Sequence, residues 1–522
     1  MRAMIRVSSL FPFLVLACVS RTQPAAAQAV GPEFRVNSYT TQNQQRPRIA
    51  TGASGSFVVV WDSGQQDNGM SFGVFGQRYD SAGAPLGAEF LVNTVTANDQ
   101  RSPAVASDSG GSFVVVWDSY FQDGSGSGVF GQRYDSTGAP LGAEFRVNIF
   151  TEGSQSRPSV GSDSSGNFIV AWQSGYPGSI FGRRFASSGA PLGGEFRVNT
   201  YTSSTQHTPS VSSDAAGNFV VVWLGFTQDG SGYGVFGQRF DMAGVPLGGE
   251  FLVNTYTTNW QVFPSVASDL GGNFIVVWES PDASGYGIFG QRYSSAGAPL
   301  GTEFRVNTST SNSQDDPAVA SDSAGNFVVV WMSISDGSSE GVFAQRYDSA
   351  GTPLGGEFLV NTFTQNAQYG PSVASDSAAH FIVVWTSTSQ DGFGYGIFGQ
   401  RFCRRPLTSA VIGVSGSSEA CPNSTGGIAT VSDTGGGLTS HQWGYRTTST
   451  TGMILPLSGQ IAAMYTINGS DFPAAGTYFL VCTTTPECGG AITSNEATVT
   501  VDVTPPGVTP PSALTTTQSL CM

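Results

Sequence analysis

The chain has 522 residues, a formal net charge of −15, and charged side chains at only 11% of its positions. This acidity argues against nucleic acid and anionic membrane surfaces as partners. The 68 glycines and the many small polar residues favour an all-β protein built of short strands joined by tight turns.

The first 29 residues have the features of a secretory signal peptide: a basic start, an apolar run over 10–19, and small residues before an expected cleavage point at Ala29. This run is too short to span a bilayer, and so is every later apolar run. We therefore expect a protein that is secreted, at the cell surface or periplasmic after cleavage near Ala29. Lipidation at Cys18, whose context loosely resembles a bacterial lipobox, is the alternative.

Residues 30–406 repeat one pattern seven times. Each copy contains an apolar run that starts with Phe, continues mostly with Val or Ile, and ends with Trp. The tryptophans are Trp61, Trp117, Trp172, Trp223, Trp278, Trp331 and Trp385, at spacings of 51 to 56 residues. A period of this length indicates a repeat architecture. No cysteine lies between 30 and 402, so we expect this part to fold without disulfides.

Each copy holds four strand-like runs, which we call the inner, second, third and outer strands. In the second copy they are residues 103–107, 113–117, 128–134 and 144–148. Turn-forming residues separate them, and short connections favour antiparallel neighbours. The second strand is apolar on both faces and needs a packed neighbour on each side, while the small side chains of the inner strand tolerate convergence on an axis. We therefore predict a seven-bladed β-propeller of four-stranded antiparallel blades.

The outer strand is offset within the repeat. Its first copy, residues 33–37, precedes the first inner strand, and the last repeat ends near Phe402 without an outer strand of its own. The N-terminal strand should therefore pair with residues 396–402 and close the ring. Such closure resembles that of WD-repeat and kelch propellers, although neither family's signature motif is present, and the chain resembles secreted bacterial propeller proteins. We expect a monomer.

Residues 407–503 differ from the repeats in composition. They are rich in Thr and Ser and contain Trp443 and a Gly-Thr-Tyr segment that leads to a cysteine over 476–482. This region resembles the immunoglobulin-like or PKD-like domains of bacterial surface proteins, which implies a C-terminal immunoglobulin-like β-sandwich. Residues 504–522 are rich in Pro and Thr and are expected to form a tail or a truncated linker.

The cysteines of this region leave the disulfide pairing open. The spacing between Tyr478 and Cys482 departs from the antibody pattern, so the usual disulfide does not follow from the resemblance. Cys421 could pair with Cys482 or with Cys488.

Repeated charged residues are interpreted as structural. A Glu begins every outer strand and an Arg occurs in every third strand, and because a catalytic pair need occur only once, we interpret them as a cross-strand ion pair. The Asp-Gly segments at 122–126, 228–232 and 390–392 suggest calcium loops but lack closely spaced carboxylates, so they are interpreted as turns. The three histidines lack metal-ligand spacing, and no nucleophile motif occurs. We expect no cofactor, with calcium as the alternative.

The loops that lead into the inner strands combine a fixed frame with variable residues. The frame N-x-x-T-x-x-x-Q-x-x-P occurs in all seven copies, and its Gln is expected to be a buried amide that satisfies the loop backbone. The two residues after the Gln differ between copies, and the loops between second and third strands, which should open on the same face, vary as well. The candidate ligand-binding residues on this face are Arg46, Arg101, Arg157, His207, Trp260, Phe263, Asp315, Asp316 and Tyr369.

Two classes of function fit this pattern. One is a non-catalytic binding or adhesion protein that recognises an extracellular glycan or protein ligand on the variable face. The alternative is a propeller glycoside hydrolase or polysaccharide lyase, which requires carboxylates from different blades to converge. Asp315 and Asp316 are adjacent acids from one repeat only, so we favour binding and predict no catalytic residue.

Overall fold

The computed structural model describes residues 28–403 except for 68–70, 176–177, 283–284, 335–338 and 378–379, and beyond them only the backbone of strands between 409 and 501. Nearly all of the predicted signal peptide, including Cys18, lies outside the described residues. No apolar helix of membrane-spanning length occurs in the described ranges.

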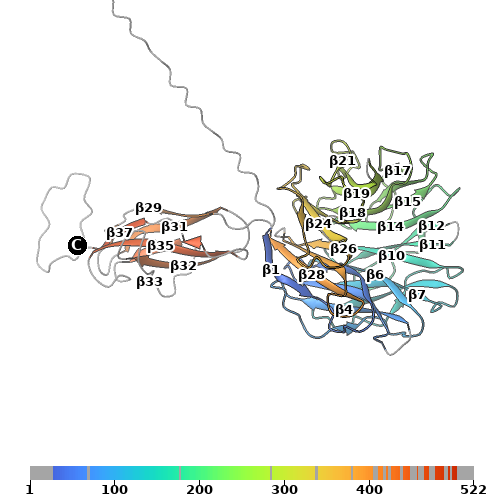
Figure 1. Ribbon diagram of the computed structural model, residues 1–522, viewed down its shortest axis with the longest axis horizontal. Coiled ribbons are helices and arrows are strands. Elements are labelled where there is room, and N and C mark those ends of the chain that lie inside the picture. Colours follow the sequence, from blue (N-terminus) through green and yellow to red (C-terminus); the bar gives the residue numbers. More distant parts are fainter. Residues whose placement is uncertain are drawn as a thin grey trace, which may run out of the picture.

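Seven four-stranded antiparallel sheets follow one another along the chain (Figure 1). The inner strands are β2 (Gln44–Thr51), β6 (Gln100–Ser107), β10 (Gln155–Ser162), β14 (Gln206–Ser213), β18 (Val262–Ser268), β22 (Gln314–Ser321) and β26 (Gln368–Ser375). The second strands are β3 (Phe57–Gly64), β7 (Phe113–Tyr120), β11 (Phe168–Ser174), β15 (Phe219–Phe226), β19 (Phe274–Pro281), β23 (Phe327–Ser333) and β27 (Phe381–Thr388). The third strands are β4 (Phe72–Tyr79), β8 (Ser127–Tyr134), β12 (Ser179–Phe185), β16 (Tyr233–Phe240), β20 (Tyr286–Tyr293), β24 (Gly341–Tyr347) and β28 (Tyr395–Cys403). The outer strands are β5 (Phe90–Leu91), β9 (Phe145–Arg146), β13 (Phe196–Arg197), β17 (Phe251–Leu252), β21 (Phe304–Arg305), β25 (Phe358–Leu359) and, for the seventh sheet, β1 (Gln28–Arg35).

These sheets are the blades of a closed propeller, numbered 1 to 7 from β2–β5 to the sheet of β26, β27, β28 and β1. Each inner strand contacts the inner strands of both neighbouring blades, and β26 contacts β2. In Figure 1 the labels of β10, β14 and β18 lie nearer the middle of the ring than those of the outer strands β17 and β21. The predicted seven-bladed propeller is confirmed for this part of the chain.

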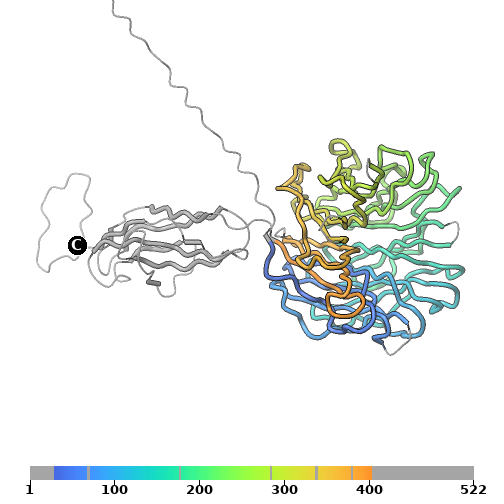
Figure 2. The backbone as a smooth tube through the Cα atoms, in the orientation of Figure 1, coloured from blue at the N-terminus to red at the C-terminus, as the bar shows by residue number. Residues whose placement is uncertain are grey.

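The N-terminal strand closes the ring as predicted. β1 pairs antiparallel with β28, with Phe34 opposite Gly399, and Val36 N donates to Ile397 O at 2.8 Å. Figure 2 shows this first segment, in blue, beside the orange end of the propeller. The strand begins at Gln28, earlier than predicted, so cleavage after Ala29 would leave a closing strand from residue 30 onward.

The outer strands of blades 1 to 6 are shorter than predicted, and all seven end early because an asparagine side chain takes over from the backbone. In blade 2 the strand ends at Arg146, and the N–H of Val129 donates to Oδ1 of Asn148 at 2.8 Å. Nδ2 of Asn148 donates to Phe150 O at 2.9 Å. The corresponding residue is buried in every blade, as Asn37, Asn93, Asn148, Asn199, Asn254, Asn307 and Asn361.

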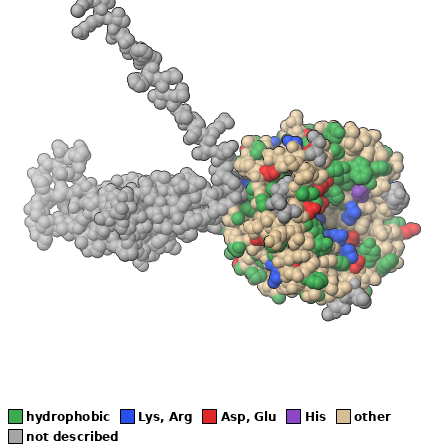
Figure 3. Space-filling model, viewed as in Figure 1, with side chains coloured by type: hydrophobic (Ala, Val, Ile, Leu, Met, Phe, Trp, Pro, Cys, Tyr) green, Lys and Arg blue, Asp and Glu red, His purple; other side chains and the backbone are tan. Residues whose placement is uncertain are grey.

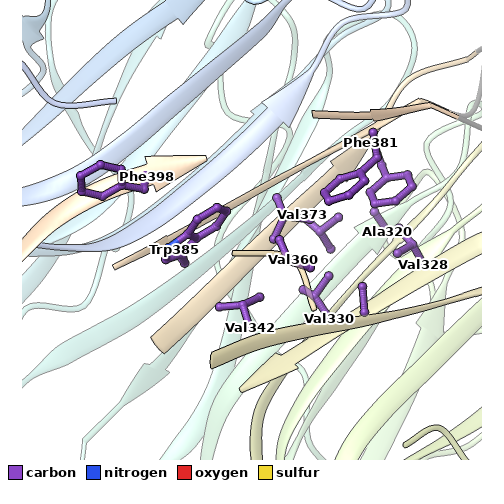
Figure 4. Packing of buried hydrophobic residues seen from close by; sticks show 12 residues of the cluster. Ala320, Val328, Val330, Val342, Val360, Val373, Phe381, Trp385 and Phe398 are labelled. Carbon is purple, nitrogen blue, oxygen red and sulfur yellow. The ribbon is translucent and has the colours of Figure 1, made fainter. Parts of the chain in front are cut away.

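The core consists of seven layers, each packed between two neighbouring blades. All seven repeat tryptophans are buried. Trp61 packs with residues of blade 7, whereas Val58 and Val60 on the other face of β3 pack with blade 2. Figure 4 shows one layer, in which Val330 of blade 6 lies near Trp385 of blade 7. The second strands are therefore buried on both faces, as predicted.

The predicted ion pair between the repeated Glu and Arg is wrong, because each of the two groups binds a neighbouring blade. Oε2 of Glu89 accepts hydrogen bonds from Ser38 N at 2.6 Å and Ser38 Oγ at 2.9 Å, just after the outer strand of blade 7. Arg78 donates to the carbonyl of Ser136 in blade 2 at 2.5 Å. A charged group bound to the backbone in this way makes a strong hydrogen bond, so both residues hold blades together.

The C-terminal strands form two sheets. One contains β29 (Ser409–Ser415), β31 (Thr425–Thr434) and β34 (Met464–Asn468). The other contains β30 (Glu419–Ala420), β37 (Ala497–Val501), β35 (Gly476–Pro486), β32 (Thr439–Arg446) and β33 (Leu455–Pro456), with β36 (Ile492–Thr493) paired to β35. The disulfide candidates Cys421, Cys482 and Cys488 lie outside the residues whose side chains are described.

Candidate functional site

Every inner strand begins with a β-bulge formed at the variable residues. In blade 1, Gln45 lies opposite Asp62 and Arg48 opposite Val60, so Arg46 is an extra residue in the ladder. The second variable residue has φ between 52° and 59° in all seven blades, namely Arg46, Ser102, Arg157, Thr208, Phe263, Asp316 and Gly370. We call the seven variable pairs the bulge ring. Bulges redirect side chains, and a positive φ is costly for residues other than glycine, so the ring has the local strain typical of functional sites.

A buried glutamine holds each loop in place. Nε2 of Gln44 donates to Thr41 O at 2.9 Å, and its Oε1 accepts from Nδ2 of Asn37 at 3.3 Å. The predicted role of this Gln is confirmed, since its copies in the other blades are buried as well. The loops between second and third strands lie on the same face, because Phe226 N donates to Thr205 O at 2.9 Å. We call this the variable face.

In blades 2 and 5 the residue that follows the tryptophan accepts a hydrogen bond from the bulge of the next blade. Oδ2 of Asp118 accepts a hydrogen bond from Arg157 N at 3.4 Å, and Oε1 of Glu279 accepts one from Asp316 N at 2.6 Å. The position holds Asp62, Asp118, Gln173, Leu224, Glu279, Met332 and Thr386. Sequence reasoning missed these residues, although their variation between copies was a usable signal.

Burial raises the pKa of each of the three acids at this position. Burial raises the pKa of Asp62 to about 7, and Arg46, whose Nη1 lies 3.0 Å from Oδ2 of Asp62, acts in the opposite direction. Burial also raises the pKa of Asp118 to about 6 and that of Glu279 to about 9. Asp62, Asp118 and Glu279 are only 0%, 6% and 3% exposed, so a ligand on the surface cannot reach them.

An exposed aromatic patch joins blades 4 and 5 on the variable face. It consists of His207, Phe226, Tyr233 and Trp260. The ring centroid of Tyr233 lies 4.9 Å from that of His207, 4.8 Å from that of Phe226 and 5.6 Å from that of Trp260. Trp260 is 52% exposed and Phe226 36%. Burial, with a smaller effect of Arg157, lowers the pKa of His207 to about 4, so the imidazole is neutral at pH 7.

The predicted site residues fall into three groups. Arg157 and His207 both hydrogen-bond Oγ1 of Thr208, at 2.8 and 2.9 Å, and so connect to the aromatic patch that contains Trp260. Arg46 pairs with Asp62, and Arg101 pairs with Asp99 at 3.0 Å. The remaining candidates are separate from these groups: Phe263 is exposed in its own bulge, Asp315 and Asp316 lie on blade 6, and Tyr369 contacts Tyr395 with centroids 5.6 Å apart.

Arg48 is a further residue that sequence reasoning missed. It follows the bulge on β2, at a position occupied by Ala104, Ser159, Ser210, Ser265, Ala318 and Ser372 in the other blades. The residue is exposed, yet enough protein surrounds its guanidinium that burial lowers its pKa. Asp316 of blade 6 and Asp62 act in the opposite direction. Asp316 belongs to blade 6 and Arg48 to blade 1, and blade 7 lies between these blades. An electrostatic effect across blade 7 therefore places Arg48 near the axis of the ring.

The described residues contain no group of three His, Cys, Asp or Glu side chains placed to hold a metal ion. In the first segment considered for calcium, Oδ2 of Asp123 accepts a hydrogen bond from Nδ2 of Asn148 at 3.1 Å. Oδ1 of Asp123 accepts one from Ser125 N at 3.3 Å. Both carboxylate oxygens therefore serve the turn and the adjoining outer strand.

The opposite face has cavities between blades, but their polar groups already have partners. A cavity of about 300 Å³ between blades 5 and 6 is lined by Asp269, Arg292 and Tyr293. Nη2 of Arg292 donates to Ser349 O at 2.5 Å, and Oδ1 of Asp269 accepts from Asn273 N at 2.9 Å. The variable face differs in that its polar and aromatic groups are exposed. Figure 3 shows acidic and basic side chains gathered toward the middle of the visible face of the propeller, with a histidine beside them.

No protein-family model and no curated protein matches the chain. A protein of unknown function from Dyadobacter fermentans aligns with 72% of this chain and 98% of its own length, at 10% identity and a TM-score of 0.44. An α-L-arabinanase of Penicillium chrysogenum, solved with arabinobiose, aligns with 72% and 98%, at 13% identity and a TM-score of 0.42. The polysaccharide lyase Uly1 aligns with 74% and 94%, at 8% identity and a TM-score of 0.44. These likenesses carry no inference about ligand or activity.

Proposed function

We propose that this chain is a non-catalytic binding protein, secreted or held at the cell surface, that recognises a glycan through the aromatic patch on its variable face. The observation that carries the proposal is the contiguous set of His207, Phe226, Tyr233 and Trp260, with Trp260 more than half exposed. Soluble proteins seldom leave such a patch open without a ligand. Flat aromatic faces beside hydrogen-bonding groups suit sugar rings, which have apolar faces and polar edges.

The burial of the perturbed carboxylates favours binding over catalysis. A hydrolase or lyase needs acids that reach the scissile bond, within hydrogen-bond distance of the proton they transfer. Asp62, Asp118 and Glu279 come from different blades, as the enzymatic alternative requires, but all three are buried beneath the bulge ring. Asp118 and Glu279 also accept hydrogen bonds from the backbone of the next blade. Their arrangement supports a role in holding the binding surface in shape.

The location and the C-terminal region belong to the same proposal. Cleavage of a signal peptide near Ala29 would export the protein, and a closed propeller without cysteine over 30–402 needs no disulfide to fold outside the cell. The strands between 409 and 501 are proposed to form the immunoglobulin-like module implied by their sequence, which would present the propeller at a surface.

Screening the purified full chain against an array of glycans tests the proposal. Trp260→Ala should lower the affinity for the bound glycan at least about tenfold, as loss of an aromatic anchor does. Leu270→Ala is the matched control, because Leu270 is also an exposed apolar side chain but lies in an inner-to-second-strand hairpin on the opposite face. Equal affinities of the two variants would contradict the chosen site. Cleavage of the glycan by the intact protein would support the enzymatic alternative.

A further inference from the structure

Four arginines of the propeller belong to the inner strands, those of blades 1 to 3, and not to the third or outer strands. The repeated arginines of the third strands hold neighbouring blades, as Arg78 does. The four others either follow a loop glutamine or lie just after a bulge, and they are Arg46, Arg48, Arg101 and Arg157. All 22 basic residues of the chain are arginines. Guanidinium groups bind carboxylate, sulfate and phosphate with two parallel hydrogen bonds, which the ammonium group of lysine cannot do.

Arg101 is already occupied by its own surroundings. Its Nη2 lies 3.0 Å from Oδ2 of Asp99, and its Nε donates to the same oxygen at 3.0 Å. Its guanidinium also lies over the ring of Phe72, 4.1 Å from the centroid. We therefore assign Arg101 no direct part in ligand binding.

Arg157 offers most of its donors to a ligand. The residue is exposed, and in the described part of the chain its side chain makes a single hydrogen bond, from Nη1 to Oγ1 of Thr208 at 2.8 Å. A guanidinium has five N–H donors, so a second, bidentate partner can still bind. The same Thr208 oxygen lies 2.9 Å from Nδ1 of His207, which begins the aromatic patch. Arg157 therefore flanks the patch.

Arg46 and Arg48 extend this basic edge toward the axis. The side chain of Arg46 is 46% exposed and is directed by the buried Asp62, 3.0 Å away. Arg48 donates to Pro47 O at 2.8 Å. Burial is the main cause that lowers the pKa of Arg48, and the charge of Arg46 adds a smaller effect in the same direction. Asp316 offsets part of the charge of Arg48 and Asp62 pairs with Arg46, so Arg157 is the arginine with the most donors left for an anion.

We propose that the glycan recognised by the aromatic patch is anionic, and that Arg157, which flanks the patch, binds its carboxylate or sulfate groups. This inference rests on the proposed function and deepens it by naming the class of ligand. The sugar ring stacks on Trp260, and the charged substituent reaches Arg157 across His207 and Thr208. The chain as a whole carries a formal charge of −15, so polyanions are repelled at long range and bind only where arginines are placed for them.

The test compares three oligosaccharides of equal length, one neutral, one with uronic acid residues and one with sulfate esters, by calorimetric titration of the full chain. We expect an acidic oligosaccharide to bind at least about tenfold tighter than the neutral one, the difference that one charge-assisted bidentate pair provides. Arg157→Gln should lower the ratio of the acidic to the neutral affinity to below about twofold, and Arg157→Lys should restore this ratio only in part. The affinities for the uronic acid and the sulfated oligosaccharide show which anionic group is preferred.

The control is Arg305→Gln, at an exposed arginine on the outer strand of blade 5 that lies away from the bulge ring. It should bind all three sugars as the unaltered chain does. If Arg157→Gln keeps the preference for acidic sugars while Trp260→Ala loses all binding, the inference is overturned and the proposed function stands. If the folded chain binds none of the sugars, charged or neutral, the proposed function itself is overturned.

Discussion

At the scale of single residues, the most informative feature is that one buried position carries different side chains in different blades. Asp62, Asp118 and Glu279 occupy the place that Leu224 and Met332 fill elsewhere. A buried carboxylate costs free energy unless it is hydrogen-bonded, and a propeller can be built with apolar residues there. The three acids therefore lower the free energy of unfolding. Each of them lies beneath a residue of the bulge ring or pairs with one. Their main effect is therefore on the geometry of the variable face.

Glu279 should make the stability of the protein depend on pH. Burial raises its pKa from 4.5 to about 9, so between these values the folded state holds a proton that the unfolded state releases. Stability from this group is complete below pH 4.5 and is lost as the pH rises toward 9. Glu279→Gln keeps an oxygen for Asp316 N and removes the charge, so it should stabilise the protein by roughly 3–5 kcal/mol at pH 8, at about 1.4 kcal/mol for each pH unit above 4.5, and have little effect at pH 4.

Urea unfolding at pH 4, 6 and 8 measures this dependence. The control is Glu152→Gln, at an exposed loop position. A stability difference that is the same at all three pH values would contradict the buried, protonated state of Glu279.

Two tryptophans on neighbouring blades should respond in opposite ways to truncation. Trp223 is fully buried, and its Nε1 donates to Oε1 of Gln206 at 2.9 Å. Trp223→Ala should therefore destabilise the fold by roughly 3–5 kcal/mol, through a cavity and an unsatisfied amide. Trp260→Ala should cost well under about 1 kcal/mol, since Trp260 is exposed, and should lower ligand affinity instead. Similar denaturation midpoints for both variants would show that the assignment of core and surface is wrong.

At the scale of elements, closure of the ring depends on β1, which is far in sequence from β28, the strand with which it pairs. Besides the pairing of β1 with β28, Oε2 of Glu33 accepts a hydrogen bond from Thr362 N at 2.7 Å, after the outer strand of blade 6. Glu250 makes the same contact with Thr200 N at 2.6 Å between two blades that are joined by continuous chain. The same contact between a Glu carboxylate and a Thr backbone N–H therefore occurs both where the ring closes and between blades that are consecutive in the chain.

The closure should be more sensitive than the interior of the ring to loss of this contact. Glu33→Gln and Glu250→Gln remove the same charge, but only at Glu33 does the contact hold an outer strand that is not joined to its third strand by a hairpin. Glu33→Gln should therefore increase hydrogen exchange in β28 more than Glu250→Gln does in β16. Deletion of residues 30–39 should go further, exposing the edge of β28 and causing aggregation. A deletion variant that melts unchanged would refute the closure.

The sequence predicted the elements well because seven copies act as comparisons within one chain. The alternation in Phe57–Trp61 predicted burial on both faces, and the offset of residues 33–37 predicted the closure. It did not predict that Glu89 would bind Ser38, because the partner depends on how blades twist past one another. It named His207 and Trp260 but missed Phe226 and Tyr233, since the four residues come from different loops and strands that only the assembled ring brings together.

At the scale of the whole molecule, the contacts that close the propeller lie between residues of the propeller itself. The strand β1, the clamp of Glu33 on Thr362 and the contact of β26 with β2 all join parts of the range 28–403. The aromatic patch and the bulge ring lie within the same range. The described closing contacts and the proposed binding surface therefore all lie within residues 28–403.

A chain that ends at residue 406 should consequently fold and bind as the full chain does. We expect the same thermal midpoint for the propeller transition, within about 2 °C, because domains with their own core unfold independently. The truncated protein should also bind the oligosaccharide recognised by the full chain with an unchanged dissociation constant. Calorimetric melting and titration of both proteins measure the two quantities. Loss of the cooperative transition in the truncated chain would show that the C-terminal strands complete the propeller, whereas retained melting with lost binding would place part of the ligand site on those strands.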